Sequence, residues 1–158
     1  MHLEPIWQAP VQQQVYRELL NAFSYPGQVK NLNALIADHH ALHALLATLL
    51  DGESRLADTT GQLKATHWSL LQAQNFAVEQ AQFIVADGKQ STELHPNLGS
   101  LASPEHGATL ILMVDGFYSQ GHAVSLQLKG PGIATTTMLD VEGLNQQWLE
   151  QRAQWNQH

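Results

Sequence analysis

The chain of 158 residues contains no cysteine and has few charged side chains. The absence of cysteine excludes disulfide bonds, a thiolate nucleophile and any zinc or iron–sulfur site built on thiolates. Charged residues make up 13% of the chain, which is about half of the roughly 25% usual in globular domains. Two explanations stay open: a surface rich in Gln, Asn and His, or a surface that other subunits cover.

Positive charge is scarcer still, with seven Lys and Arg against fourteen Asp and Glu and a formal net charge of −7. The Lys and Arg residues do not cluster, so the basic patch that nucleic-acid binding requires is missing. Neighbouring chains would have to supply much of the positive charge for any phosphate or phosphonate ligand. The electrostatics therefore predict no nucleic-acid partner.

Long apolar runs are also absent. None approaches the roughly 20 residues of a membrane span, and residues 1–10 lack the basic flank and apolar core of a signal peptide. Residues 1–10 are instead predicted to be an irregular N-terminal arm, with Ile6 and Trp7 as possible anchors. We expect a cytoplasmic protein without a membrane partner.

Apolar spacing indicates helices and strands in alternation along the chain. A period of 3.6 residues predicts helices from residue 11 to the Pro26-Gly27 break, over 33–50 and over 141–155. Leucines spaced for burial against a sheet lie in the second helix: Leu42, Leu45, Leu46, Leu49 and Leu50. Leu144, Trp148 and Trp155 are expected on the inner side of the third. The segment 67–71 fits either a strand or a helix.

Strands are predicted at 83–86, 108–114 and 123–128. The run 108–114 is almost continuously apolar, as expected for a central strand covered on both faces. The run 123–128 alternates apolar and polar residues, as expected nearer an edge. Helices interspersed with both kinds of strand predict one layered α/β domain with a mixed sheet, spanning residues 1–158.

A histidine cluster is the most conspicuous candidate site. His39 and His43 are four residues apart, so both imidazoles would share one helix face and could bind zinc. The glutamate of the known zinc-protease motif is missing, because His40 stands in its place. A solvated polar helix face explains the cluster better, and we predict no metal site.

Two loops could carry ligand chemistry. Gly130-Pro131-Gly132 follows a strand and could offer backbone N–H groups to a phosphate, but Pro131 removes one donor and the sequence favours a tight turn. Glu105 and His106 precede a strand, where an acid/base pair can lie, although capping or a hydrogen-bonded turn explains them better. These four residues, Glu105, His106, Gly130 and Gly132, are the possible ligand or partner contacts.

Lysine chemistry gives no stronger candidate. A Schiff base with pyridoxal phosphate would require a lysine in a recognisable setting. None of Lys30, Lys64, Lys89 and Lys129 has one. The residues themselves therefore predict no catalytic residue and no cofactor.

The order of several sequence blocks resembles the PhnH family, the H subunit of bacterial carbon–phosphorus lyase. The most specific blocks are Pro104-Glu105-His106-Gly107-Ala108-Thr109-Leu110 and Gly130-Pro131-Gly132-Ile133. The remaining similar blocks lie at 16–27, 45–51, 81–88 and 141–144. The segment 64–71 departs from the family pattern. The family also continues into a further strand that this sequence lacks after His158. Either the chain is a divergent short member or its true C-terminus is not shown, and a missing strand would leave a sheet edge open.

The resemblance implies a three-layer αβα domain similar to the pyridoxal-phosphate transferase fold but without the cofactor. It implies a homodimer that joins the G, I and J subunits of the carbon–phosphorus lyase core complex. That complex transfers an alkylphosphonate to the ribose of ATP with release of adenine. The H subunit would be non-catalytic or auxiliary. Two alternatives remain: a stand-alone small-molecule enzyme using Glu105 and His106, and a metal-binding module at His39 and His43.

Overall fold

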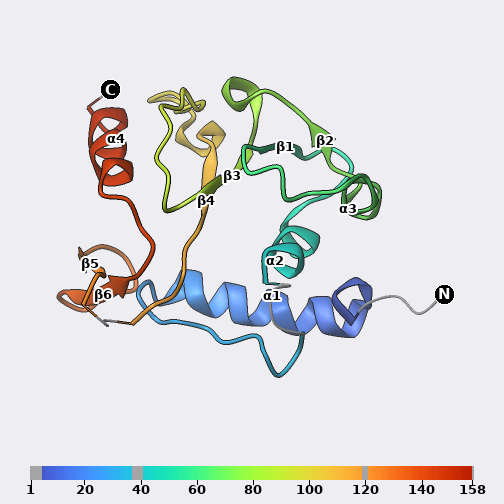
Figure 1. Cartoon of the computed structure of the whole chain (residues 1–158), viewed down its shortest axis with the longest axis horizontal. Coiled ribbons are helices and arrows are strands. Elements are labelled where there is room, and N and C mark those ends of the chain that lie inside the picture. The colour runs from blue at the N-terminus through green and yellow to red at the C-terminus, as the bar shows by residue number, and fades with distance from the viewer. Residues whose placement is uncertain (1–4, 37–40, 119–120, 158) are drawn as a thin grey trace.

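The computed structural model describes residues 5–36, 41–118 and 121–157 (Figure 1). The first half contains η1 (Pro5–Trp7), α1 (Ala9–Ser24), α2 (Ala41–Leu49), β1 (Arg55–Asp58), α3 (Ala65–Leu71) and β2 (Gln74–Asn75). The second half contains η2 (Val78–Gln80), β3 (Phe83–Asp87), η3 (Pro104–His106), β4 (Thr109–Met113), β5 (Val124–Leu128), β6 (Thr137–Val141) and α4 (Gln147–Trp155). In the part of the chain described, no helix is long and apolar enough to cross a membrane.

The strands form two sheets rather than one. A four-stranded sheet has the order β2-β1-β3-β4, and all its neighbouring strands are parallel. The strands β5 and β6 pair antiparallel in a separate two-stranded sheet. The predicted α/β class is confirmed, but the prediction of a single mixed sheet is wrong, because parallel and antiparallel pairing are segregated.

Helices cover both faces of the parallel sheet. On one face, Leu56 and Val85 pack with Leu46 of α2 and Leu71 of α3. On the other face, Ile84 packs with Trp148 of α4 in a second buried cluster. Because alternate residues of a strand point to opposite faces, the consecutive buried residues of β3 supply both clusters.

The strand β4 lies at the edge of this sheet, not at its centre as predicted. Among the described strands it pairs only with β3, with Phe83 opposite Thr109. Its residue Leu110 is among the side chains that pack on one face of the sheet, and Ile111 is among those on the other. Contact with both clusters explains a continuously apolar run in an edge strand.

The N-terminal residues are more regular than predicted. Ile6, in a 3-10 turn, is 2% exposed, which confirms it as an anchor, and α1 begins at Ala9. Pro10 does not prevent this start, because a helix leaves the first N–H groups without internal partners and proline has none to lose.

The second predicted helix is shorter than expected. Among the described residues of the predicted helix, Leu32–Ile36 form turns, with Ile36 buried beside Val15, and Ala41–Leu49 form a helix. Residues 37–40 lie outside the described part of the chain. Leu42 and Leu46 are buried as predicted, while Leu45, Leu49 and Leu50 are half-buried. After the helix, the Ser54 hydroxyl donates to the carboxylate of Asp51 at 2.8 Å, and this bond lowers the pKa of Asp51.

The third predicted helix is also shorter. Its expected first turn is instead the end of β6 and a turn at Gly143, whose φ of +76° no L-residue adopts easily. The helix α4 begins at Gln147, and Leu144, Trp148 and Trp155 all contact the core as expected. The ambiguous segment 67–71 is helical, within α3.

Candidate functional site

An apolar stripe runs along the exposed side of α1. Tyr16, Leu20 and Phe23 are 53%, 53% and 65% exposed. Their spacing of four and three residues puts them on one helix face. The buried face of the same helix carries Val15, so α1 is apolar on two sides. An exposed apolar stripe of this kind is a candidate surface for contact with another chain.

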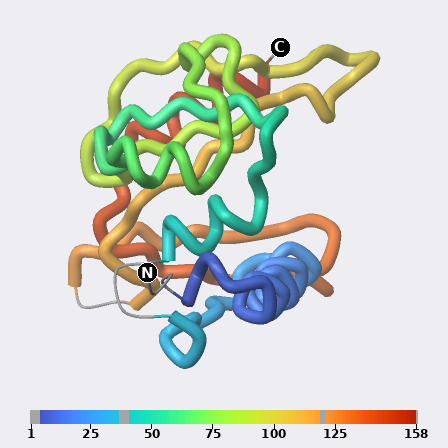
Figure 2. Tube along the Cα trace, turned by 90° about the vertical axis from the view of Figure 1, so that its right-hand side faces the viewer, coloured from blue at the N-terminus to red at the C-terminus, as the bar shows by residue number. Residues whose placement is uncertain are grey.

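The C-terminal end of α1 meets the β5–β6 turn, as Figure 2 shows where the blue helix lies beside an orange segment. Gly132, with a φ of +83°, lies against the carbonyl oxygen of Ser24 and the ring of Pro26. Gly27, with a φ of +94°, lies equally close to the side chain of Thr137. Both glycines leave room for the other segment, since any Cβ there would overlap it.

The turn itself explains the glycines Gly130 and Gly132 as structural residues. Gly130 accepts a hydrogen bond from the Ile133 amide at 3.1 Å and has a φ of +139°. The space beside Gly132 is filled by the backbone of α1 rather than open to a ligand. Their role as ligand or partner contacts stays a prediction, but the geometry supports a tight turn.

The carboxyl ends of β3 and β4 are fastened to the segment after β6. The Gly88 amide donates to the Met113 carbonyl at 2.7 Å, and the Asn145 amide donates to the Gly88 carbonyl at 2.7 Å. The indole of Trp148 donates to the carbonyl of Asp87 at 3.1 Å. Hydrogen bonds to backbone carbonyls thereby join the end of β3, the end of β4 and the segment 145–148.

An exposed ion pair lies at the same junction. The ammonium of Lys89 is 2.7 Å from the carboxylate of Asp115. Hydrogen bonding and attraction to Asp115 raise the pKa of Lys89, so this lysine stays protonated and is a poor nucleophile. A cavity of about 300 Å³ adjoins the pair. One carboxylate oxygen of Glu142, on its wall, is buried and has no hydrogen-bond partner among the described residues.

Glu105 and His106 lie at the amino ends of the strands, away from the Lys89–Asp115 pair at their carboxyl ends. They belong to η3, just before β4. Their carboxylate and imidazole are 3.9 Å apart, and the side chains are 68% and 71% exposed. This pair borders a cavity of about 310 Å³. The structure does not bring it together with Gly130 and Gly132, which are at the α1 end of the molecule. An enzyme based on this pair stays a prediction.

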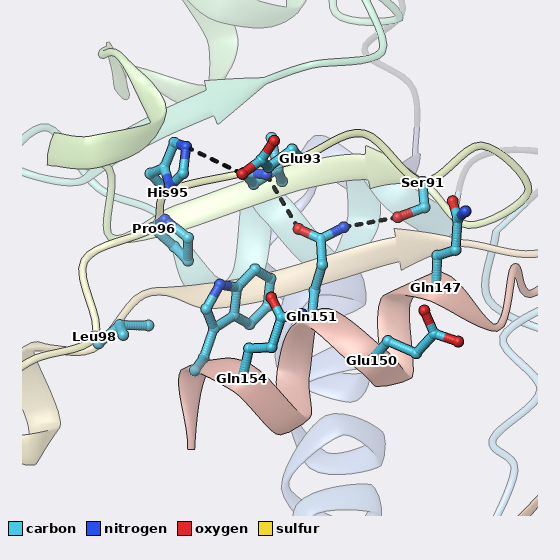
Figure 3. A pocket seen from close by; sticks show the side chains of 11 residues that line it. Ser91, Glu93, His95, Pro96, Leu98, Gln147, Glu150, Gln151 and Gln154 are labelled. Carbon is cyan, nitrogen blue, oxygen red and sulfur yellow. Dashed lines mark hydrogen bonds and ion pairs between the residues drawn. The ribbon is translucent and has the colours of Figure 1, made fainter. Parts of the chain in front are cut away.

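A further cavity, of about 560 Å³, lies between residues 91–98 and α4 (Figure 3). Gln151 of α4 joins the two sides of this cavity. Its side-chain oxygen accepts a hydrogen bond from the Leu94 amide at 3.1 Å, and its NH₂ group donates one to the Ser91 hydroxyl at 2.7 Å. Glu93 and Glu150 line it, without any lysine or arginine among its lining residues. Nothing in the sequence signalled this cavity, because it lies between a loop and a helix that are far apart in the sequence.

The histidine cluster falls partly outside the described residues, because His39 and His40 belong to 37–40. His43 is described, and its ring lies 4.1 Å from that of His67. Within the described ranges, no group of three or more His, Cys, Asp or Glu side chains is arranged to hold a metal. The metal-binding alternative at His39 and His43 therefore gains no support from His43.

The comparison with known proteins identifies the class. A family model described as bacterial phosphonate metabolism protein (PhnH) matches residues 6–158, so the chain belongs to this family. The chain is also 43% identical over 155 residues to the putative C-P lyase subunit protein HtxG of Stutzerimonas stutzeri. That match covers 97% of this chain and 76% of HtxG.

Family membership confirms the resemblance predicted from the ordered blocks. Two pairs of these blocks meet in the structure. In the first, Pro26-Gly27 lies against the Gly130-Pro131-Gly132 turn and the start of β6. Asp87-Gly88 lies against the segment that begins at Glu142. These four motifs thus form contacts between distant segments.

Proposed function

We propose that this chain is a non-catalytic or auxiliary subunit of a cytoplasmic carbon–phosphorus lyase complex. In that role it supports the transfer of an alkylphosphonate to the ribose of ATP with release of adenine. Its partners are the G, I and J subunits, and the isolated chain forms a homodimer. Its kinship to the pyridoxal-phosphate transferase fold, without the cofactor, belongs to the same proposal.

The observation that carries the proposal is the exposed stripe Tyr16, Leu20 and Phe23 in a chain of this family. Large aromatic and aliphatic side chains at the centre of an interface supply most of the binding free energy. The charged residues of α1 are Arg17, which is exposed, and Glu18, which is half-buried. The exposed face is therefore weakly charged, as interface centres are.

Two features of the candidate catalytic groups support an auxiliary role. Lys89 is held in an ion pair that raises its pKa, the opposite of what a nucleophilic amine requires. Glu105 and His106 are both mostly exposed. Water around them screens the attraction between the carboxylate and the imidazole.

The test is co-purification of the tagged chain with its G, I and J homologues. A Leu20→Gln, Phe23→Gln variant changes the stripe while keeping good helix formers on α1. The matched control is Leu101→Gln, since Leu101 is 98% exposed in a loop away from α1. We expect wild type and the control to recover the partners and the stripe variant to lose them. A folded wild-type chain that recovers none of the three would contradict the proposal.

The homodimer has its own test. Light scattering of the isolated chain gives its mass directly, and the two variants show whether the stripe also serves self-association. A wild-type chain that stays monomeric at high concentration would contradict the homodimer and leave the partner proposal standing.

A further inference from the structure

The cavity of about 310 Å³ at the amino ends of β1, β3 and β4 is rich in hydrogen-bond donors. It is lined by Arg55, Gln82, Phe83, Asn97, Glu105, His106, Gly107 and Thr109. The sequence predicted only Glu105 and His106 as contacts. The other polar residues are brought to this edge by the parallel order of the strands.

Two amide side chains that line the cavity, Gln82 and Asn97, are oriented by hydrogen bonds to their oxygens, and their NH₂ groups make none within the described residues. The carbonyl oxygen of the Gln82 side chain accepts from the Arg55 backbone amide at 3.0 Å. The side-chain oxygen of Asn97 accepts from the Gly99 amide at 2.9 Å. A backbone N–H can only meet the oxygen of such a side chain, so the contact decides the orientation of each amide. Both NH₂ groups, Gln82 Nε2 and Asn97 Nδ2, have no partner among the described residues. Both side chains are exposed, so these donors are open to a ligand or to water.

Arg55 adds a positive charge to the lining, and no described carboxylate forms an ion pair with it. Its side chain lies over the ring of Phe76, with its guanidinium carbon 5.8 Å from the ring centre. Within the described part of the chain, no Asp or Glu lies within ion-pair distance of it. Guanidinium groups bind oxyanions through paired N–H donors.

The other residues of the lining narrow the class of ligand that the cavity suits. Thr109 offers a hydroxyl, and His106 offers a ring nitrogen at the rim. Glu105 is the single acidic side chain in the lining, and it lies 3.9 Å from His106. Its charge opposes an anion, so the site suits a small ligand with few charges rather than a polyphosphate.

We propose that this cavity binds a small tetrahedral oxyanion of the phosphate or phosphonate class. Gln82, Asn97, Arg55 and Thr109 would donate to its oxygens. The inference deepens the proposed function and rests on it only for phosphonate as the preferred member of the class.

The experiment is calorimetric titration of the isolated, full-length chain at constant ionic strength. Inorganic phosphate, methylphosphonate and acetate are the probes, and they separate the possible sources of the oxyanion. We expect saturable binding of phosphate and methylphosphonate, and at least about tenfold weaker binding of acetate, which offers fewer acceptor oxygens. Equal binding of acetate, or no saturable binding of the two tetrahedral anions, would overturn the proposal.

The decisive variant is Gln82→Glu. It keeps an oxygen to accept from the Arg55 amide but replaces the unspent NH₂ by a second carboxylate oxygen. We expect it, and Arg55→Gln, to weaken binding at least about tenfold. Glu105→Gln should strengthen binding, because it removes the opposing charge. The matched control is Gln127→Glu, which adds the same charge at an exposed position of β5 and should bind like wild type.

Two results with the variants would contradict the proposed oxyanion site. One is unchanged affinity in a folded Gln82→Glu protein, checked by circular dichroism. The other is an equal loss in Gln127→Glu, which would mean that net charge alone governs binding. Both readouts use the isolated chain. Failure here is therefore distinct from failure to recover the G, I and J subunits, which would contradict the proposed function instead.

Discussion

Gly132 lies so close to the carbonyl oxygen of Ser24 that a Cβ atom at position 132 would overlap it. The contact joins the β5–β6 turn to the last turn of α1, two segments far apart in the sequence. The sequence motif Gly130-Pro131-Gly132 is therefore explained by packing. Its last glycine is required twice, once for its φ of +83° and once for the close approach.

Gly132→Ala should destabilise the protein by about 2 kcal/mol or more, since a left-handed backbone at alanine costs about 1–2 kcal/mol and the overlap adds to it. Urea unfolding followed by circular dichroism measures the change. Gly52→Ala is the matched control, because a Cβ atom at position 52 would have no neighbouring atom within 4 Å and the φ of Gly52 is not positive. We expect this control to change the free energy of unfolding by no more than about 0.5 kcal/mol. Equal effects of the two substitutions would refute the packing role.

The ion pair of Lys89 and Asp115 predicts a pH-dependent contribution to stability. The pKa of Lys89 is raised in the folded chain by Asp115. Its stabilising contribution is therefore complete below the unfolded pKa, about 10.4, and is lost as the pH rises through the folded pKa. Asp115→Asn should lower the melting temperature at pH 8, and its difference from wild type should shrink towards pH 11.

The control for this pH dependence is Glu79→Gln. Glu79 is exposed on η2 and, among the described residues, is not in an ion pair. Its difference from wild type should not shrink over the same pH range. A difference for Asp115→Asn that stays constant or grows between pH 8 and pH 11 would count against the ion pair as the cause.

The sequence sufficed for elements whose signal is local. The helix α1, the buried run of β3 and the inward position of Trp148 follow from periodicity and were predicted correctly. The exposure of Tyr16, Leu20 and Phe23 was not predicted. The strand β1 was missed, because four residues with one charge at each end, Arg55 and Asp58, carry little periodic signal. It becomes a strand through pairing with β2 and β3 on its two sides.

The errors have a common physical cause, namely tertiary pairing that local spacing cannot contain. Val141 fits the start of a helix, yet it ends β6 and pairs with Val124 of β5. The position of β4 at the sheet edge depends on which strands lie beside it. The donor-rich cavity near Glu105 likewise required the amino ends of three strands to be placed together, and only Glu105 and His106 could be predicted from their motif.

Trp148 offers a test of the junction at the end of β3. It is 2% exposed, and its indole donates to the Asp87 carbonyl. Trp148→Phe removes this bond and some buried volume, so we expect a loss of about 1–3 kcal/mol in urea unfolding. Trp155→Phe, at a half-buried position of the same helix, should cost less. The reverse ranking would show that the junction is not held by Trp148.

The two apolar sides of α1 should respond differently to polar substitution. Phe23→Gln changes a side chain that is 65% exposed, so the stability of the isolated chain should change by no more than about 0.5 kcal/mol. Val15→Gln puts an amide where Val15, 2% exposed, packs with Ile6, Ile36 and Ala44, and should cost about 3 kcal/mol or more. Thermal unfolding of dilute samples compares the two variants without contributions from association. A large loss in Phe23→Gln under these conditions would mean that Phe23 stabilises the fold itself, and the stripe would then no longer be surface available to a partner.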